Sequence, residues 1–399
     1  MLLVLEVTGP SRVKVGDLAT YRVGSFSEAD PSPQAVAAVR WLIKAADGGV
    51  LAHVTQQGGE LQLTIPDHWA GQNILVMAYM RTPSAQVARR TTVEARAEAP
   101  ADTTRSGPRQ VDVVSEGGRY YASVDGEPRF YVGTDVRYGT RRGLMNSSNP
   151  PGPRYKPQEF EAVHGDWAWY LFPTITCESR GHFTCLNTYD RAAFTFGHIQ
   201  LAAHTPDNNF VEFFRLLLND PAASEYFPEL RLSNGRIHRL EESGSLTPLE
   251  SAVSSAPLMS YLNPRADRVD LEEAEKAARL VDWTVRHANM RDQQVAFVVR
   301  QQRRKLRHHA TKLPLDGTVD KLCLVVLDIL HQGRAGYPSI RTALAANDPF
   351  DALLSLGASQ YRERVATLRS GIRDLEASGK VGAKVFDAST GEFVAPGGA

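Results

Sequence analysis

The chain has 399 residues, of which 42% are hydrophobic and 23% charged, as in ordinary globular proteins. Lys+Arg and Asp+Glu both number 45, so no net charge draws the chain onto nucleic acid. No apolar run approaches the roughly 20 residues of a membrane-spanning helix. The length allows two or more domains, and we expect a multidomain α+β protein.

Residues 1–97 carry the patterns of short β-strands separated by turns. Trp41 falls in a central strand, and a turn at Val15-Gly16-Asp17 precedes Tyr21, which resembles immunoglobulin-like modules. Residues 1–97 are therefore predicted to form an immunoglobulin-like β-sandwich. The predicted strands cover 3–7, 18–23, 39–43, 61–65 and 73–79, with turns at Asp47-Gly48-Gly49 and Gln57-Gly58-Gly59.

Residues 98–110 are polar and contain proline, which predicts a linker. A β-hairpin is expected next, formed by 119–124 and 129–132 around an Asp125-Gly126 turn. Residues 138–155 are rich in Gly, Pro and Asn. They are expected to be irregular, either as a plain connector or as the lip of a cleft. Residues 111–155 are thus predicted to form a β-hairpin and a connector.

Residues 156–379 are predicted to form a mostly helical domain, followed by a tail or short hairpin at 380–399. The basic run 300–312 lacks the interleaved aromatics that stack on bases, which argues against nucleic acid. The run is expected to be a solvated helix face paired with Glu272, Glu273 and Glu275, and the alternative is a contact for phosphate or carboxylate polymers such as cell-wall glycans. The helices are expected at 210–218, from Asp270 to beyond 285, at 319–330, and at 360–378 before Gly379.

The segment 176–200 (TCESRGHFTCLNTYDRAAFTFGHIQ) holds two carboxylates, Glu178 and Asp190, joined by a polar loop. Glycosidic bond cleavage needs one acid to protonate the leaving oxygen and a second group to activate water or stabilise positive charge. Aromatic residues near Glu178 are expected to desolvate it and raise its pKa. They are Trp167, Trp169, Tyr170 and Phe172. The plainer alternative is a buried glutamate at a helix end and a turn aspartate.

The pair Glu178-Ser179, followed by Gly197-His198-Ile199-Gln200, resembles the lysozyme superfamily. In its soluble lytic transglycosylases and goose-type lysozymes, a Glu-Ser pair ends a helix and a Gly-x-x-Gln segment follows. Glu178, Asp190 and Thr195 also resemble the Glu, Asp and Thr-x-Gly pattern of phage-type lysozymes. The resemblance implies a lysozyme-like domain with Glu178 as the acid and Asp190 or Thr195 as the second group.

Further residues are candidates for binding the sugar. Tyr189 and Gln200 are expected to orient it, with Ser179 beside Glu178 and His198 in the cleft floor. His331 and Gln332 end an apolar helix, where they either bind sugar hydroxyls and amides or only cap the helix.

Other functional interpretations of these residues have less support in the sequence. Cys177 and Cys185 either close a small disulfide loop or pack as reduced side chains, and Cys323 is expected in the core. His198, His204 and Asp207 lack the spacing of a metal site, so no metal or other cofactor is expected. Ser179 lacks a nucleophile elbow, which argues against a serine hydrolase.

These patterns predict a peptidoglycan-degrading glycoside hydrolase that cleaves the β-1,4 bond between amino sugars, as a muramidase or a lytic transglycosylase. The alternatives are a chitosanase or chitinase, and a non-catalytic wall-binding structural component. The N-terminus lacks the basic region of a secretory signal, so we expect synthesis in the cytoplasm and specialised export to the cell wall. That context suggests an antibacterial effector of type VI secretion or a phage-type lysin. The expected partners are glycan strands, an immunity protein, and a secretion-apparatus component bound by the N-terminal module.

Overall fold

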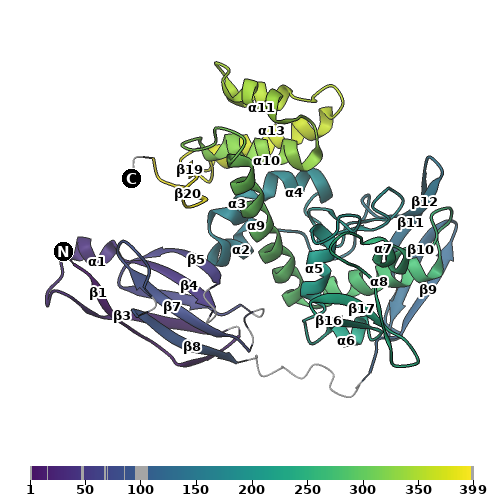
Figure 1. The fold of residues 1–399 in the computed structure, drawn as a ribbon, viewed down its shortest axis with the longest axis horizontal. Helices are drawn as coiled ribbons and strands as arrows, with labels where there is room; N and C mark the ends of the chain where they lie inside the picture. The colour runs from purple at the N-terminus through teal and green to yellow at the C-terminus, as the bar shows by residue number, and fades with distance from the viewer. Residues whose placement is uncertain are drawn as a thin grey trace. The chain divides into compact units, whose positions relative to one another are not determined.

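The computed structural model describes residues 2–15, 17–45, 49–66, 69, 71–84, 86–94 and 107–396. It is a mixed α+β protein with 35% helix and 27% strand, which agrees with the predicted multidomain α+β class. The chain divides into two compact units (Figure 1). Unit 1 comprises Met1–Thr104 and Lys156–Tyr170, and unit 2 comprises Arg105–Tyr155 and Leu171–Ala399. The predicted linker lies largely outside the described residues, as do Gly16, Asp47 and Gly48 of the predicted turns.

Unit 1 contains two sheets that share one hydrophobic core. Trp41 and Tyr21 are buried at its centre, and their polar atoms are satisfied. The Trp41 Nε1–H donates to the Gly58 carbonyl over 2.8 Å, and the Tyr21 hydroxyl donates to Thr91 Oγ1 over 3.1 Å. One sheet has the order β1(Val4–Thr8), β3(Leu18–Phe26), β6(Glu60–Thr64). The other has the order β2(Arg12–Lys14), β8(Ala88–Glu94), β7(Asn73–Tyr79), β4(Arg40–Ala45), β5(Val50–Gln57).

All five strands predicted for this region are present, and the sequence patterns missed β2, β5 and β8. Within unit 1, β2 and β8 pair in parallel and the other neighbours pair antiparallel. Three helices complete the unit: α1(Pro33–Ala37), α2(Pro157–His164) and α3(Asp166–Tyr170). Helix α2 packs against β5 and α3. Residues 156–170, which the sequence patterns join to the helical domain, thus group with the β-rich unit.

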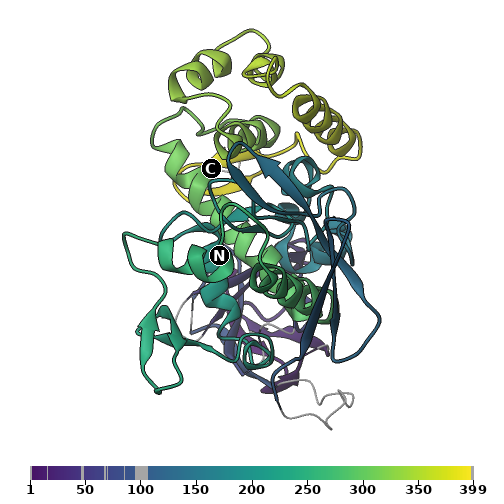
Figure 2. The ribbon, with the colours of Figure 1, turned by 90° about the vertical axis from the view of Figure 1, so that its right-hand side faces the viewer.

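Unit 2 is built on a seven-stranded antiparallel sheet, whose long blue strands are seen on the right of Figure 2. The predicted hairpin is confirmed, with Asp125 at φ 56° and Gly126 at φ 78°. The prediction that 138–155 is irregular is wrong for its first part, because β12 pairs with β11 there. The order is β15(Leu201–Ala202), β14(Thr195–Phe196), β13(Leu186–Asn187), β12(Arg141–Met145), β11(Phe130–Tyr138), β10(Arg119–Val124), β9(Val111–Glu116).

In unit 2, α8 packs against β9, β10 and β11, and α5 packs against β15. Helix α8 begins with a capping box in which the Asp270 carboxylate accepts from the backbone N–H of Glu272 over 3.0 Å. The four helices predicted from sequence are α5, α8, α10 and α13. The helices of unit 2 are α4(Phe172–Ser179), α5(Asn209–Leu217), α6(Ala223–Tyr226), α7(Ala256–Leu262), α8(Leu271–Arg286), α9(Ala288–Ala310), α10(Asp320–Gln332), α11(Tyr337–Leu344), α12(Pro349–Ser355) and α13(Arg362–Ala377).

Two small sheets complete unit 2. One contains β16(Leu230–Ser233), β17(Arg236–Leu240) and β18(Leu246–Pro248). The C-terminal segment forms the hairpin alternative, β19(Val385–Asp387) with β20(Glu392–Val394). The buried Asp320 carboxylate holds it against the start of α10, accepting from the backbone N–H of Gly382 over 2.6 Å. Among the described residues no helix is long and apolar enough to cross a membrane.

The predicted pairing of the basic run with the 272–275 acids is wrong. Arg304 pairs with Glu212 over 2.7 Å, and Arg307 pairs with Glu392 over 3.3 Å. The acids Glu272 and Glu275 pair within their own helix at i,i+4 spacing, and Glu273 is fully buried. Local helical pairs therefore take precedence over the long-range pairing suggested by charge alone.

Candidate active site

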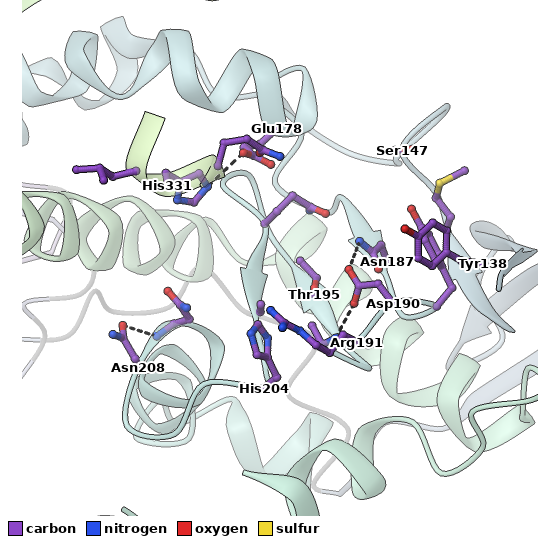
Figure 3. Close-up of a pocket in the computed structure, with 18 of the residues that line it drawn as sticks. Tyr138, Ser147, Glu178, Asn187, Asp190, Arg191, Thr195, His204, Asn208 and His331 are labelled. Atoms are coloured by element: carbon purple, nitrogen blue, oxygen red, sulfur yellow. Dashed lines mark hydrogen bonds and ion pairs between the residues drawn. The ribbon is translucent and has the colours of Figure 1, made fainter. Parts of the chain in front are cut away.

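A cavity of about 850 Å³ opens in unit 2 among the residues predicted to be functional (Figure 3). This volume lies in the usual range for small-molecule sites. Seven of the nine predicted site residues line it: Glu178, Tyr189, Asp190, Thr195, Gln200, His331 and Gln332. The sequence thus identifies one contiguous site, built from α4, α10 and the loops around β13 to β15.

Glu178 lies in the last turn of α4. The helix ends because Arg180 takes the left-handed conformation, with φ 53°, and its N–H donates to the Thr176 carbonyl over 3.1 Å. The neighbouring Ser179 is buried, and its hydroxyl donates to the His198 carbonyl over 2.7 Å. Ser179 therefore fixes the helix end to the 197–200 turn and does not line the cavity.

The Glu178 carboxylate is held by an arginine and a histidine. Its Oε1 lies 2.7 Å from Arg364 Nη1 and 3.2 Å from His331 Nε2, and its side chain is 13% exposed. Burial acts to raise the pKa of Glu178, but the hydrogen bonds and charges of His331 and Arg364 outweigh it and leave this pKa below its usual value. The expected raised pKa of Glu178 is therefore wrong for the unliganded protein.

A buried charge network lies behind Glu178. Arg364 also donates to Asp328, with 2.7 Å from Nη2 to Oδ1, and Arg334 Nη2 donates to Asp328 Oδ2 over 3.0 Å. Asp328 and the Arg334 side chain are fully buried. The predicted helix end at 328–334 thus does more than cap α10, because it anchors the arginine that contacts Glu178. Removing one member of such a network leaves an uncompensated buried charge.

Asp190 lies on the loop between β13 and β14, where neutral groups hold it. Its Oδ1 accepts from the backbone N–H of Ala192 over 2.7 Å, and its Oδ2 accepts from Asn187 Nδ2 over 3.3 Å. The buried Asn263 amide bridges the two ends of this loop, donating to the carbonyls of Thr188 over 2.9 Å and Ala193 over 3.1 Å.

Glu273 supports the same loop from α8. Its carboxyl oxygen accepts from the Thr188 hydroxyl and from the backbone N–H of Leu144, the latter over 3.1 Å. Burial raises the pKa of Glu273 to about 7, while these hydrogen bonds act to lower it. Gly143 permits the approach of the loop, because a Cβ there would lie 2.5 Å from Thr188 Oγ1.

Thr195 and Gln200 lie in the segment that continues from this loop. Thr195 belongs to β14, and Gln200 stands at φ 56° in the turn before β15. The Gln200 amide nitrogen donates to the carbonyls of Cys185 and Gly197 over 3.1 and 3.0 Å. Gln200 thus lines the cavity, while its side-chain amide N–H groups bind the backbone carbonyls of Cys185 and Gly197.

His198 is placed away from the cavity. It is 1% exposed and stacks on Tyr155 with 5.7 Å between ring centroids. Its Nδ1 lies 3.2 Å from Gln294 Oε1, and burial lowers the pKa of His198 to about 4. His198 therefore supports the site from the core rather than forming its floor.

Among the described residues, the cysteines form no disulfide and the residues considered as metal ligands form no metal site. All three cysteines are free, so Cys177 and Cys185 do not form the disulfide alternative. Burial raises the pKa of Cys185 to about 12. Within the described part of the chain, no group of three or more His, Cys, Asp or Glu residues is placed to hold a metal ion.

Several cavity residues were not predicted. Lys305 and His309 reach the cavity from α9, Arg191 follows Asp190, and Tyr138 reaches it from β11. Lys305 and His309 are four residues apart and so share a helix face. That spacing within the basic run was the available signal. Tyr138 begins the 138–155 segment, for which the lip of a cleft was one of the two expectations, and Met145 and Ser147 of that segment also line the cavity. Arg364 carries no comparable pattern, because helix packing brings it to the site.

Comparison of the chain with protein-family models, curated proteins and solved structures found no match.

Proposed function

We propose that the protein is a glycoside hydrolase of lysozyme-like type that cleaves the β-1,4 bond between amino sugars of peptidoglycan. The observation that carries the proposal is the placement of Glu178 and Asp190 on the lining of one cavity. Cleavage of a glycosidic bond uses two such groups around the scissile linkage.

The local architecture supports a lysozyme-like assignment. Glu178 ends a helix, and three short antiparallel strands follow, with Asp190 in the first connection and Thr195 in the second strand. The same order of helix-terminal Glu, loop Asp and strand Thr underlies the resemblance to the lysozyme superfamily.

In the proposed reaction, Glu178 gives its proton to the glycosidic oxygen as the C1–O bond breaks, and the leaving sugar departs as an alcohol. Asp190 accepts a proton from the water that attacks C1, or it stabilises the oxocarbenium-like charge. A bound glycan displaces water from around Glu178. Because burial already acts to raise the pKa of Glu178, further desolvation favours the protonated form needed for acid catalysis.

The test is the Glu178→Gln variant, assayed by the loss of turbidity of purified cell walls. The variant keeps the shape of the side chain but has no proton to donate, so lysis is expected to fall by roughly 10²–10⁴-fold. Glu242→Gln, at an exposed position away from the cavity, serves as the matched control and is expected to lyse walls normally. Equal lysis by Glu178→Gln and wild type would remove Glu178 from its role.

We further propose that unit 1 is an immunoglobulin-like sandwich that positions the enzyme or delivers it. Its two sheets over a common core and its buried Trp41 in β4 support this assignment. Because such folds serve many functions, the fold names no partner. The isolated unit can be tested for retention on cell walls or on a secretion-apparatus component.

A further inference from the structure

Two cations on the cavity lining have no ion-pair partner among the described residues. Lys305 and Arg191 line the cavity, and neither side chain forms an ion pair or a hydrogen bond with another described residue. The two acids of the cavity are already engaged. Glu178 is taken by Arg364 and His331, and Asp190 accepts from neutral donors within its own loop.

Because Lys305 is partly buried, the lack of an anionic partner for its ammonium group is energetically unfavourable. Lys305 is half-buried on α9, and burial lowers the pKa of its ammonium group to about 8. The neighbouring Arg304 lowers this pKa further, and Glu178 acts in the opposite direction. A partly desolvated ammonium gains most from an anion that enters the cavity, since a charge-assisted hydrogen bond is stronger where water is excluded.

We infer that the cavity recognises a glycan bearing carboxylates, with Lys305 as the principal contact and Arg191 as a second contact from the exposed loop. This inference rests on the proposed function and narrows its substrate. Peptidoglycan carries carboxylates, on the lactyl group of muramic acid where no peptide is attached and on the stem peptide where one is, whereas chitin is uncharged and chitosan is cationic. The two free cations therefore favour peptidoglycan over both alternative polymers.

The experiment measures binding by titration calorimetry in a Glu178→Gln background, which prevents turnover. The probes are a tetrasaccharide of alternating N-acetylglucosamine and N-acetylmuramic acid with free lactyl carboxylates, the same compound as its methyl ester, and chitotetraose. The free acid is expected to bind about tenfold more tightly than its ester, the range for a hydrogen bond to a charged group.

Variants at position 305 test whether Lys305 causes the preference for the free acid over its ester. Lys305→Met keeps the length of the side chain without its charge and is expected to bind acid and ester equally. Lys305→Arg restores a cation and is expected to retain most of the preference. Lys312→Met, two residues beyond the end of α9 and not on the cavity lining, is the matched control and is expected to keep the preference fully.

The outcomes separate the inference from the function. If acid, ester and chitotetraose bind with equal affinity, recognition of the carboxylate is overturned while the glycan-binding site stands. If Lys305→Met keeps the full preference, the role of Lys305 is overturned. If none of the three probes binds, both the inference and the proposed function fail.

Discussion

The two walls of the cavity hold their carboxylates by different means. On the helical wall, formed by α4, α9 and α10, Glu178 is fixed by charge, with Arg364 and His331 at 2.7 and 3.2 Å. On the loop wall, formed by residues 187–202, Asp190 is fixed by neutral amide groups. Figure 3 shows Glu178 with His331 on one side and Asp190 with Asn187 on the other.

This difference gives the two carboxylates of one site different electrostatic environments. The charged partners lower the pKa of Glu178 and link it to a rigid, buried network. The loop wall instead depends on backbone hydrogen bonds, which orient Asp190 without adding a cation. In glycosidases, separate environments divide the roles of two carboxylates by raising the pKa of the acid. Here the partners of Glu178 lower its pKa in the unliganded protein, so its role as the acid depends on the desolvation that a bound glycan brings. The following variants test whether the two walls act in this divided way.

The largest effect after loss of Glu178 is expected from Asp190→Asn. The amide keeps the shape of the side chain but cannot accept a proton from water, so hydrolysis should fall by about 10²-fold. Reducing ends released from purified walls measure this rate. A small change would instead indicate a transglycosylase that needs one acid.

Loss of Asn263 tests the loop wall. Asn263→Ala leaves the carbonyls of Thr188 and Ala193 without their donor, which should cost about 1–3 kcal/mol of stability. Because Asn263 positions the loop that carries Asp190, Asn263→Ala should lower kcat about tenfold and change KM little. Asn146→Ala, which also removes two hydrogen bonds from this sheet, is the control. An equal loss of kcat in both variants would contradict a specific role for Asn263.

The helical wall can be tested by pH. His331→Leu removes a hydrogen bond and a charge that lower the pKa of Glu178, so this pKa should rise. Glu178 must be protonated to act as the acid. The alkaline limb of kcat/KM should therefore move to higher pH by about one unit. An unmoved limb would show that protonation of Glu178 does not limit the rate.

The last test concerns stability and leaves activity aside. Because burial raises the pKa of Glu273 from 4.5 to about 7, the folded state binds its proton more tightly than the unfolded state. The stability from this group is complete below pH 4.5 and is lost as pH rises through 7, a change of roughly 3 kcal/mol. Glu273→Gln should remove this slope from urea-unfolding curves recorded across that range. A slope unchanged in the variant would place the titration elsewhere.

Local patterns in the sequence predicted much of the fold. The capping residues Asn208 and Asp270 marked helix starts, and Asp125-Gly126 marked a hairpin. Strand β12 was missed because its Arg141-Arg142-Gly143 start is polar, although it pairs with the neighbouring strand β11.

The same limit applies to the site. One stretch of 25 residues identified Glu178, Asp190 and Thr195, since they lie close in sequence. Arg364, which controls the charge of Glu178, lies 186 residues away and is brought there by packing of α13 against α4. His198 shows the converse, because proximity in sequence suggested the cleft floor whereas its ring is buried.

The most direct measurement is mass spectrometry of the fragments released from a defined peptidoglycan by wild type and by Glu178→Gln. The account predicts disaccharide-peptide fragments from wild type and almost none from the variant, with the fragment ends distinguishing hydrolysis from transglycosylation. Intact glycan strands after treatment with the wild-type protein, or the same fragments from both proteins, would contradict it.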